Sequence, residues 1–267
     1  MARTATVYGL PAEGLGCGAG SSVTIRAVSM GGVATAAIEA LVPGLCPHCE
    51  QPLAGRDRGL CGACWAAVIP RPGTICQRCG GATDDELEPC LECLRAPPPQ
   101  AGTAIWGEHD GALRTAVLAL KHGRRDDLAA PLGMRLAARV AAAPWAGELE
   151  IVSWVPSHAL RRLRRPWSAA ELLARELARA LGLPARRLLA RRGLGRQTGS
   201  SRARRLQLPR RSFRARSLRR GVTVLLVDDV TTTGATLRLA AGALRAAGAA
   251  AVYAAVLAQT PDSRRIT

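Results

Sequence analysis

The stretch GVTVLLVDDVTTTGATLRLA, from Gly221 to Ala240, decides the fold of this chain. An apolar run, two acids, a segment of threonine and glycine, and an amphipathic segment follow one another without a gap. The apolar run is typical of a buried strand, and the last segment has the spacing of a helix. Because parallel α/β sheets bind ligands beyond the carboxyl ends of their strands, we expect a binding site at the turn.

The residue types in this turn suit a sugar phosphate. The strand is expected to deliver Asp228 and Asp229 to its carboxyl edge, where carboxylates can accept hydrogen bonds from vicinal ribose hydroxyls. Five residues of the turn that follows offer backbone N–H groups at a helix N-terminus, together with hydroxyl donors for a 5-phosphate. They are Thr232, Thr233, Gly234, Ala235 and Thr236. An ordinary capped turn is the alternative, but a cap needs only one acceptor.

Strands and helices alternate on both sides of this stretch. We expect strands at residues 103–106, 151–156, 222–227 and 251–257, and helices at 111–121, 128–141, 168–181 and 236–247. A short helix is also expected near residues 33–45, before the first cysteine pair. Such alternation predicts βαβ units, hence an α/β fold with a parallel sheet flanked by helices.

Four C-x-x-C pairs precede this domain, and their first cysteines lie 15, 15 and 14 residues apart. The pairs are Cys46 and Cys49, Cys61 and Cys64, Cys76 and Cys79, and Cys90 and Cys93. Since a structural zinc site takes four ligands, eight cysteines predict two closed Zn²⁺ sites. Sequential grouping is our preferred assignment, and the spacing also permits an interleaved one. Few large apolar side chains accompany them, so bound metal should supply much of the folding energy.

Other uses of C-x-x-C pairs fit the sequence less well. Disulfides are disfavoured in a reducing compartment, and a redox pair normally occurs once, not four times. The chain has no secretory signal pattern at its start and no apolar span of about 20 residues, so we expect a cytoplasmic protein without membrane insertion. The histidines, His48, His109, His122 and His158, are expected to be solvated or structural rather than metal ligands.

The motifs resemble those of known families. The string from Val224 to Thr236 is similar to the motif with which type I phosphoribosyltransferases bind 5-phosphoribosyl 1-pyrophosphate (PRPP). With the cysteine pairs upstream, the arrangement resembles the ComF family, from about Val42 to Ala258. This resemblance implies a type I phosphoribosyltransferase-like parallel sheet behind a small double zinc ribbon. It also implies PRPP with Mg²⁺ as ligand, and a link to the DNA-uptake machinery.

The resemblance assigns roles to further residues. Asp228 and Asp229 would be the catalytic acids. The segment from Val155 to Arg165 stands where type I enzymes place their pyrophosphate loop, so the diphosphate candidates are Arg161, Arg162, Arg164, Arg165 and Lys121. The stretch from Arg191 to Phe213 resembles a mobile catalytic loop, in which Gln197, Ser201, Arg202 and Arg205 match the family pattern.

Two segments depart from that pattern. Pro166 to Ala169 replaces a Gly-Phe-Asn-Gln run found in many ComF-like sequences, and Leu208 replaces an asparagine. The amide side chains that would recognise a base are therefore absent from these positions. The sequence does not identify the acceptor of a phosphoribosyl group.

The positive charge is concentrated in one part of the chain. Of a net charge of +17, the segment from Arg161 to Arg220 contributes 20 arginines against Glu171 and Glu176. Such a block attracts polyanions, including phosphates and single-stranded DNA, although the coding bias of a GC-rich genome explains it equally well. Three functions stay open: Mg²⁺-dependent transfer from PRPP, handling of single-stranded DNA, and PRPP or nucleotide sensing without turnover.

These patterns divide the chain into five parts. We expect a poorly structured extension at residues 1–41, a double zinc ribbon at 42–95 and a proline-rich linker at 96–101. The phosphoribosyltransferase-like domain should span 102–260, followed by a tail at 261–267. Met30 is a candidate for the true start of translation.

Overall fold

The structure is a computed structural model that describes residues 44–53, 59–68, 74–83, 89–123, 125–157, 167–191, 212–219 and 221–260. The expected extension at 1–41, with Met30 and most of the helix near 33–45, lies outside these ranges, as does the tail at 261–267.

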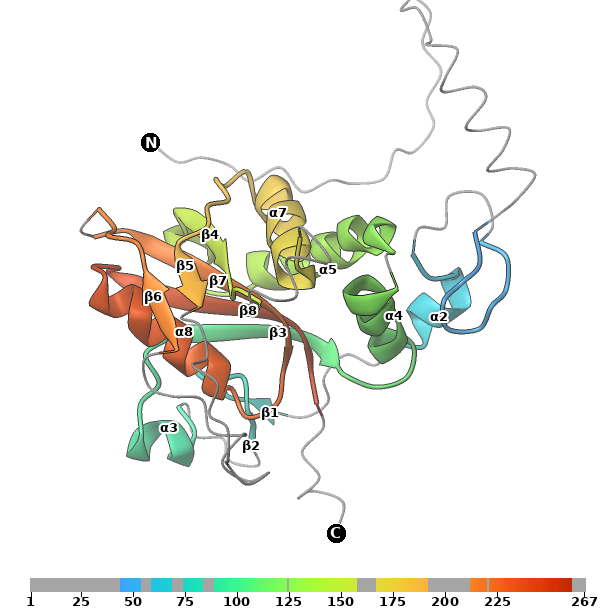
Figure 1. Cartoon of the computed structure of the whole chain (residues 1–267). Coiled ribbons are helices and arrows are strands. Elements are labelled where there is room, and N and C mark those ends of the chain that lie inside the picture. The colour runs from blue at the N-terminus through green and yellow to red at the C-terminus, as the bar shows by residue number, and fades with distance from the viewer. Residues whose placement is uncertain are drawn as a thin grey trace, which may run out of the picture. The chain divides into compact units, whose positions relative to one another are not determined.

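A four-stranded parallel sheet forms the centre of the main domain (Figure 1), as the sequence predicts. Its strands are β3 (Gly102–Glu108), β4 (Ile151–Trp154), β7 (Thr223–Thr231) and β8 (Ala251–Gln259), in the order β3-β8-β7-β4. β7 is longer than expected, because its pairing with β8 continues beyond the apolar run as far as Thr231 opposite Gln259. The acid pair therefore lies within the strand and not in the turn after it.

Helices cover both faces of this sheet (Figure 1). On one face lie α4 (Gly111–His122), α5 (Ala129–Ala141) and α7 (Ala169–Leu181), and on the other lies α8 (Ala235–Ala246) with the hairpin of β5 (Leu189–Arg191) and β6 (Phe213–Ala215). The alternation of β7 fills both cores, since Leu225 and Val227 join the first cluster while Val224 and Leu226 join the second. All four helices predicted in this domain are confirmed to within two residues.

Some short elements connect these parts. The helix expected to begin at residue 128 is preceded by a 3₁₀ turn, η1 (Asp126–Leu128), and η2 (Ala146–Glu148) leads into β4. The Ser168 hydroxyl caps α7 by accepting from the Glu171 N–H at 3.1 Å. Gly133 of α5 allows close packing on α7, since a Cβ there would lie 2.5 Å from Glu176 Cβ.

The cysteine pairs belong to small elements before the sheet. These are α2 (Gly62–Ala66), the hairpin of β1 (Thr74–Ile75) and β2 (Ala82–Thr83), and α3 (Leu91–Arg95). Trp65 of α2 packs edge-on against Trp106 of β3, with ring centroids 6.3 Å apart. The guanidinium of Arg135 lies 3.6 Å from the Trp65 ring. The ribbon module thus contacts the main domain through side chains as well as through the chain itself.

The expected linker at 96–101 is packed against the protein. Pro98 and Gln100 are buried, and the Ala101 N–H donates to the Val252 carbonyl at 2.8 Å. The domain boundaries themselves stay predictions. Within the described residues no helix combines the length and apolarity needed to span a bilayer.

Candidate functional site

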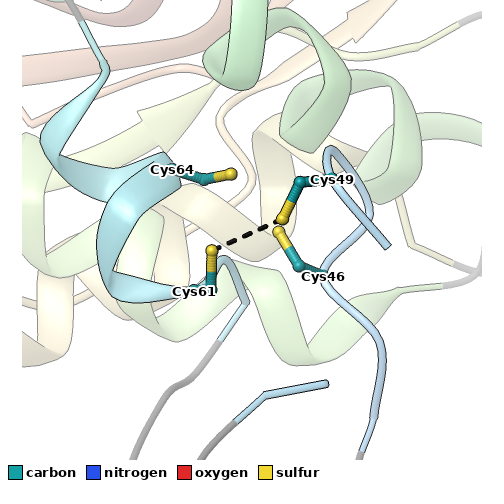
Figure 2. A group of neighbouring side chains, drawn as sticks. All are labelled: Cys46, Cys49, Cys61 and Cys64. Carbon is teal, nitrogen blue, oxygen red and sulfur yellow. Dashed lines mark hydrogen bonds between the residues drawn. The ribbon is translucent and has the colours of Figure 1, made fainter. Parts of the chain in front are cut away.

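The eight paired cysteines gather into two groups. One contains Cys46, Cys49, Cys61 and Cys64, and the other contains Cys76, Cys79, Cys90 and Cys93. The Sγ atoms of each group all lie within 4.8 Å of one another. Figure 2 shows the first four Sγ atoms converging on a common centre, with Cys49 and Cys61 Sγ 3.6 Å apart. This is the sequential grouping that the spacing favoured.

The distances suit zinc. Four sulfurs placed about 2.3 Å from one ion at tetrahedral angles would lie about 3.8 Å from each other. In the second group, Cys79 and Cys90 Sγ are 3.8 Å apart, and Cys76 and Cys93 Sγ are 4.0 Å apart. Since four thiolates complete the coordination, both sites fit structural zinc and leave no position for a substrate.

The surroundings of the first cysteine group give its thiols different pKa values. Burial raises the pKa of Cys46, but the backbone N–H groups of His48, Cys49 and Cys61 outweigh burial and lower that pKa to about 6. Burial raises the pKa of Cys64, so this thiol gives up its proton only when a cation replaces it. Metal binding is therefore coupled to the release of protons from the buried thiols.

The acid pair is buried near the carboxyl edge of the sheet. Asp228 is 8% exposed and Asp229 is 7% exposed. Asp228 Oδ1 accepts from the Asp229 N–H at 2.9 Å, and Asp229 Oδ1 accepts from the Val230 N–H at 2.8 Å. Burial, followed by the charge of Asp229, raises the pKa of Asp228 well above its ordinary value. Holding two neighbouring carboxyl groups here costs stability, which is common at binding sites.

The start of α8 is open. Gly234 precedes the helix with a φ of 73°, and nothing lies within 4 Å of the position a Cβ would take, so backbone conformation rather than crowding favours glycine. Gly234, the N-cap residue of α8, has no side chain that could cap the helix. The Ala235 N–H forms only a long hydrogen bond of 3.5 Å with Thr233 Oγ1. Thr232, Thr233 and Ala235 are exposed. The helix dipole and these N–H groups can therefore bind an anion.

A lysine of α4 contacts the acid pair, and a histidine between β3 and α4 lies within range of its charge. Lys121 Nζ lies 2.9 Å from Asp229 Oδ2 and forms an ion pair with it. The backbone N–H of His109 donates to the Gln259 carbonyl at 2.7 Å, and the buried Nε2 of its imidazole has no hydrogen-bond partner among the described residues. Burial, with the charges of Arg114 and Lys121, lowers the pKa of His109. A neutral imidazole there can accept a proton.

His109 was expected to be solvated or structural rather than a metal ligand, and it belongs to no cysteine or acid cluster that could hold a metal among the described residues, but it lies near enough to Asp229 for their charges to interact. Its position was available as a signal, because His109 directly follows β3 and the carboxyl ends of parallel strands share one edge. The order of the strands was not available from the sequence: β3 pairs with β8, and β8 lies between β3 and β7.

The described residues hold part of the expected site. Asp228, Asp229, Lys121 and the segment 232–236 lie at one edge of the sheet. The diphosphate candidates Arg161, Arg162, Arg164 and Arg165 lie outside the described residues, as do Gln197, Ser201, Arg202 and Arg205 of the expected mobile loop. Lys121, for which the resemblance implies a diphosphate contact, forms its ion pair with Asp229.

Family models and relatives identify the chain. A double zinc ribbon domain matches residues 37–94, and a phosphoribosyl transferase domain matches residues 166–265. DNA utilization protein YhgH of Salmonella typhimurium is 32% identical over 224 residues, covering 82% of this chain and 98% of the relative. Competence protein F of Haemophilus influenzae is 28% identical, covering 76% of this chain and 91% of its own. The chain belongs to the ComF family.

As a ComF family protein, the chain combines a double zinc ribbon with a phosphoribosyltransferase-type domain, as the resemblance implies. Among solved structures, the glutamine PRPP amidotransferase of B. subtilis matches at 26% identity with a TM-score of 0.36. The match covers 52% of this chain and 30% of that enzyme. The ComF chain therefore spans less than a third of the enzyme it matches.

The two cysteine groups predict a zinc content of two ions per chain. We expect Cys49→Ser to reduce this content to one, because a tetrahedral site with three thiolates binds zinc far more weakly. Plasma emission spectrometry of the purified full chain measures it. Cys17→Ser is the matched control, since this ninth cysteine has no C-x-x-C partner and its loss should leave both ions. Full zinc retention by Cys49→Ser would contradict the assignment.

The buried Asp228 predicts a stability that depends on pH. Because the folded state raises the pKa of Asp228, the folded chain binds more protons than the unfolded chain above about pH 4, and stability falls as pH rises. Asp228→Asn lacks this penalty. We expect its melting temperature to exceed that of the wild type at pH 8, by a margin that shrinks toward pH 4. A margin independent of pH, measured by calorimetry beside the exposed control Glu92→Gln, would refute this explanation.

Proposed function

We propose that the chain binds PRPP together with Mg²⁺ at the junction of β7 and α8, and transfers its ribose 5-phosphate to an acceptor. The observation that carries this proposal is the open start of α8, which directly follows a buried acid pair at the edge of a parallel sheet. The segment lies within the part that matches the phosphoribosyl transferase domain.

Each part of the junction would have a separate task. Residues 232–236 would bind the 5-phosphate through N–H groups and hydroxyls. Asp229 would accept hydrogen bonds from the ribose hydroxyls, and its charge would stabilise the positive charge that develops on the sugar as the diphosphate leaves. Mg²⁺ would neutralise charge on the diphosphate. Arg161, Arg162, Arg164 and Arg165 are the proposed protein groups for the same diphosphate.

A role with single-stranded DNA is the second candidate. It is favoured by the names of the relatives, a DNA utilization protein and a competence protein, and by the arginine-rich segment from Arg161 to Arg220. A strand of DNA would use the same kind of phosphate contact, with affinity that falls steeply as salt rises. Sensing of PRPP without turnover is the third, since it needs the junction but no acceptor.

Binding of PRPP tests the proposal directly. A ligand well above its Kd must raise the melting temperature, so we expect PRPP with Mg²⁺ to stabilise the full chain. Asp229→Asn should weaken binding by roughly tenfold or more, because it removes a charged acceptor from a buried site. Glu92→Gln, an exposed change on α3, is the matched control. Isothermal titration at one fixed salt concentration measures both, and EDTA tests the requirement for Mg²⁺.

The outcomes separate the three functions. Pyrophosphate release with a panel of bases and amines supports transfer, whereas PRPP binding without release under every acceptor supports sensing. If PRPP neither binds nor stabilises while oligodeoxythymidine binds with a steep salt dependence, the DNA function replaces the proposal.

A further inference from the structure

The first zinc ribbon contacts both ends of the segment that carries Lys121. At the start of α4, Thr115 Oγ1 lies 3.1 Å from His48 Nδ1. The Thr115 hydroxyl donates its single proton to the Gly111 carbonyl at 3.2 Å, so it accepts from the imidazole. His48 lies between Cys46 and Cys49 in the first cysteine group. One residue of the knuckle is therefore tied directly to α4.

A second contact lies just beyond the end of α4. The Arg125 guanidinium donates to the Leu45 carbonyl at 3.1 Å, next to Cys46. Arg125 is held in place by Asp127, whose two carboxylate oxygens each accept from it at 2.8 Å. In the sequence, Lys121 thus lies between Thr115 and Arg125, the two residues that form hydrogen bonds with the knuckle of Cys46 and Cys49.

Apolar packing joins the same elements. Four residues of the first ribbon share one core cluster with the buried face of α4, which includes Leu113, Val117 and Leu120. The four are Cys46, Leu60, Cys64 and Val68. Gly59 packs so closely on the end of η1 that a Cβ there would lie 2.7 Å from Leu128 Cδ2. Zinc ligands of the first group are therefore part of the core that positions α4.

The second ribbon contacts another element. The Thr103 N–H donates to the Gln77 carbonyl at 2.7 Å, and Thr103 Oγ1 donates to the Arg78 carbonyl at 2.8 Å. Gly80 packs on Ile105 of the same strand. The second cysteine group thus supports β3, whereas the first supports α4.

We propose that the first zinc site is a structural part of the sugar-phosphate site. Its ribbon positions α4 so that Lys121 holds Asp229, and loss of zinc from this site weakens PRPP binding through Lys121. Lys121 is then a positioning residue. The proposal rests on the proposed function for the identity of the ligand, whereas the link between ribbon, lysine and aspartate has its own readout.

The sensitivity follows from burial. The Asp229 side chain is only 10% exposed, so its charge depends on the ammonium 2.9 Å away. Removing one partner of a buried ion pair leaves an uncompensated charge, which drives the carboxylate to move or to take up a proton. Either change removes an acceptor from the ribose.

Because Cys49 is exposed while Cys76, Cys90 and Cys93 are buried, the first site is the one that oxidants and chelators reach more easily.

A double-mutant cycle on the full chain tests the link. Cys49→Ser and Lys121→Met should each weaken PRPP binding by roughly tenfold, and the double variant should be no weaker than Lys121→Met alone. Titration calorimetry with PRPP and Mg²⁺ gives the affinities, with zinc content measured on the same samples. Equal effects of Cys49→Ser with and without Lys121 would show general destabilisation and overturn the proposal.

A second variant covers the case in which Cys49→Ser does not fold. The double variant His48→Ala, Arg125→Ala keeps all eight zinc ligands and removes both polar contacts that flank Lys121. We expect about a threefold loss of affinity for PRPP, because two exposed hydrogen bonds are lost while the apolar packing between the ribbon and α4 remains. In the Lys121→Met background we expect no loss. His122→Ala, an exposed histidine on the same helix, is the matched control. A loss equal to that of His122→Ala contradicts the proposal.

Lys121 is the only lysine of the sequence, which allows a readout without PRPP. In ¹⁵N-labelled protein its ammonium gives a single side-chain signal, and this signal should shift when Asp229→Asn breaks the ion pair. We expect the same shift on selective loss of the first zinc. An unshifted signal overturns the coupling even if PRPP binds. Conversely, a chain that shows the shift but binds no PRPP refutes the proposed ligand and leaves the link between ribbon and lysine supported.

Discussion

The parallel pairing of β7 with β8 and β4 is the constraint on which the site depends. Central position in the sheet keeps the backbone of β7 hydrogen-bonded on both sides for its first half, and pairing with β8 continues to Thr231. This continuation carries two carboxyl groups into a buried position from which water is largely excluded. β7 ends at Thr231 and α8 begins at Ala235, so the acids and the open N–H groups of the helix start lie only a few residues apart.

Burial of the acids has to be compensated, and the compensation comes from α4. The Lys121 ammonium neutralises Asp229, while Asp228 avoids a second charge because burial and its neighbour favour the protonated form. The cation therefore belongs to the site in the same sense as the acids, since without it one buried charge would stand alone.

The zinc ribbons pack against the main domain and are not independent domains joined to it by a linker alone. Cys46 and Cys64 of the first ribbon share a core with α4 and α5, and backbone carbonyls of the two ribbons accept hydrogen bonds from β3 and from Arg125. With few large apolar side chains of its own, such a module needs metal to fold and a neighbour to pack against. The same lack of an independent core explains why metal in the first ribbon bears on the position of α4.

Local sequence determined the secondary-structure elements of the main domain and the residue types of its candidate sites. Apolar periodicity predicted the parallel strands and the helices, C-x-x-C spacing predicted two four-thiolate groups, and the run from Asp228 to Thr236 predicted a phosphate-binding turn, because each signal is carried by residues close in the chain. Only the tertiary structure decided that β7 continues through Asp228 and Asp229 and that Lys121 pairs with Asp229. It also decided that His109 lies near Asp229 and that the first ribbon contacts α4. These contacts join residues far apart in sequence, and sheet order and packing, which no local pattern encodes, bring them together.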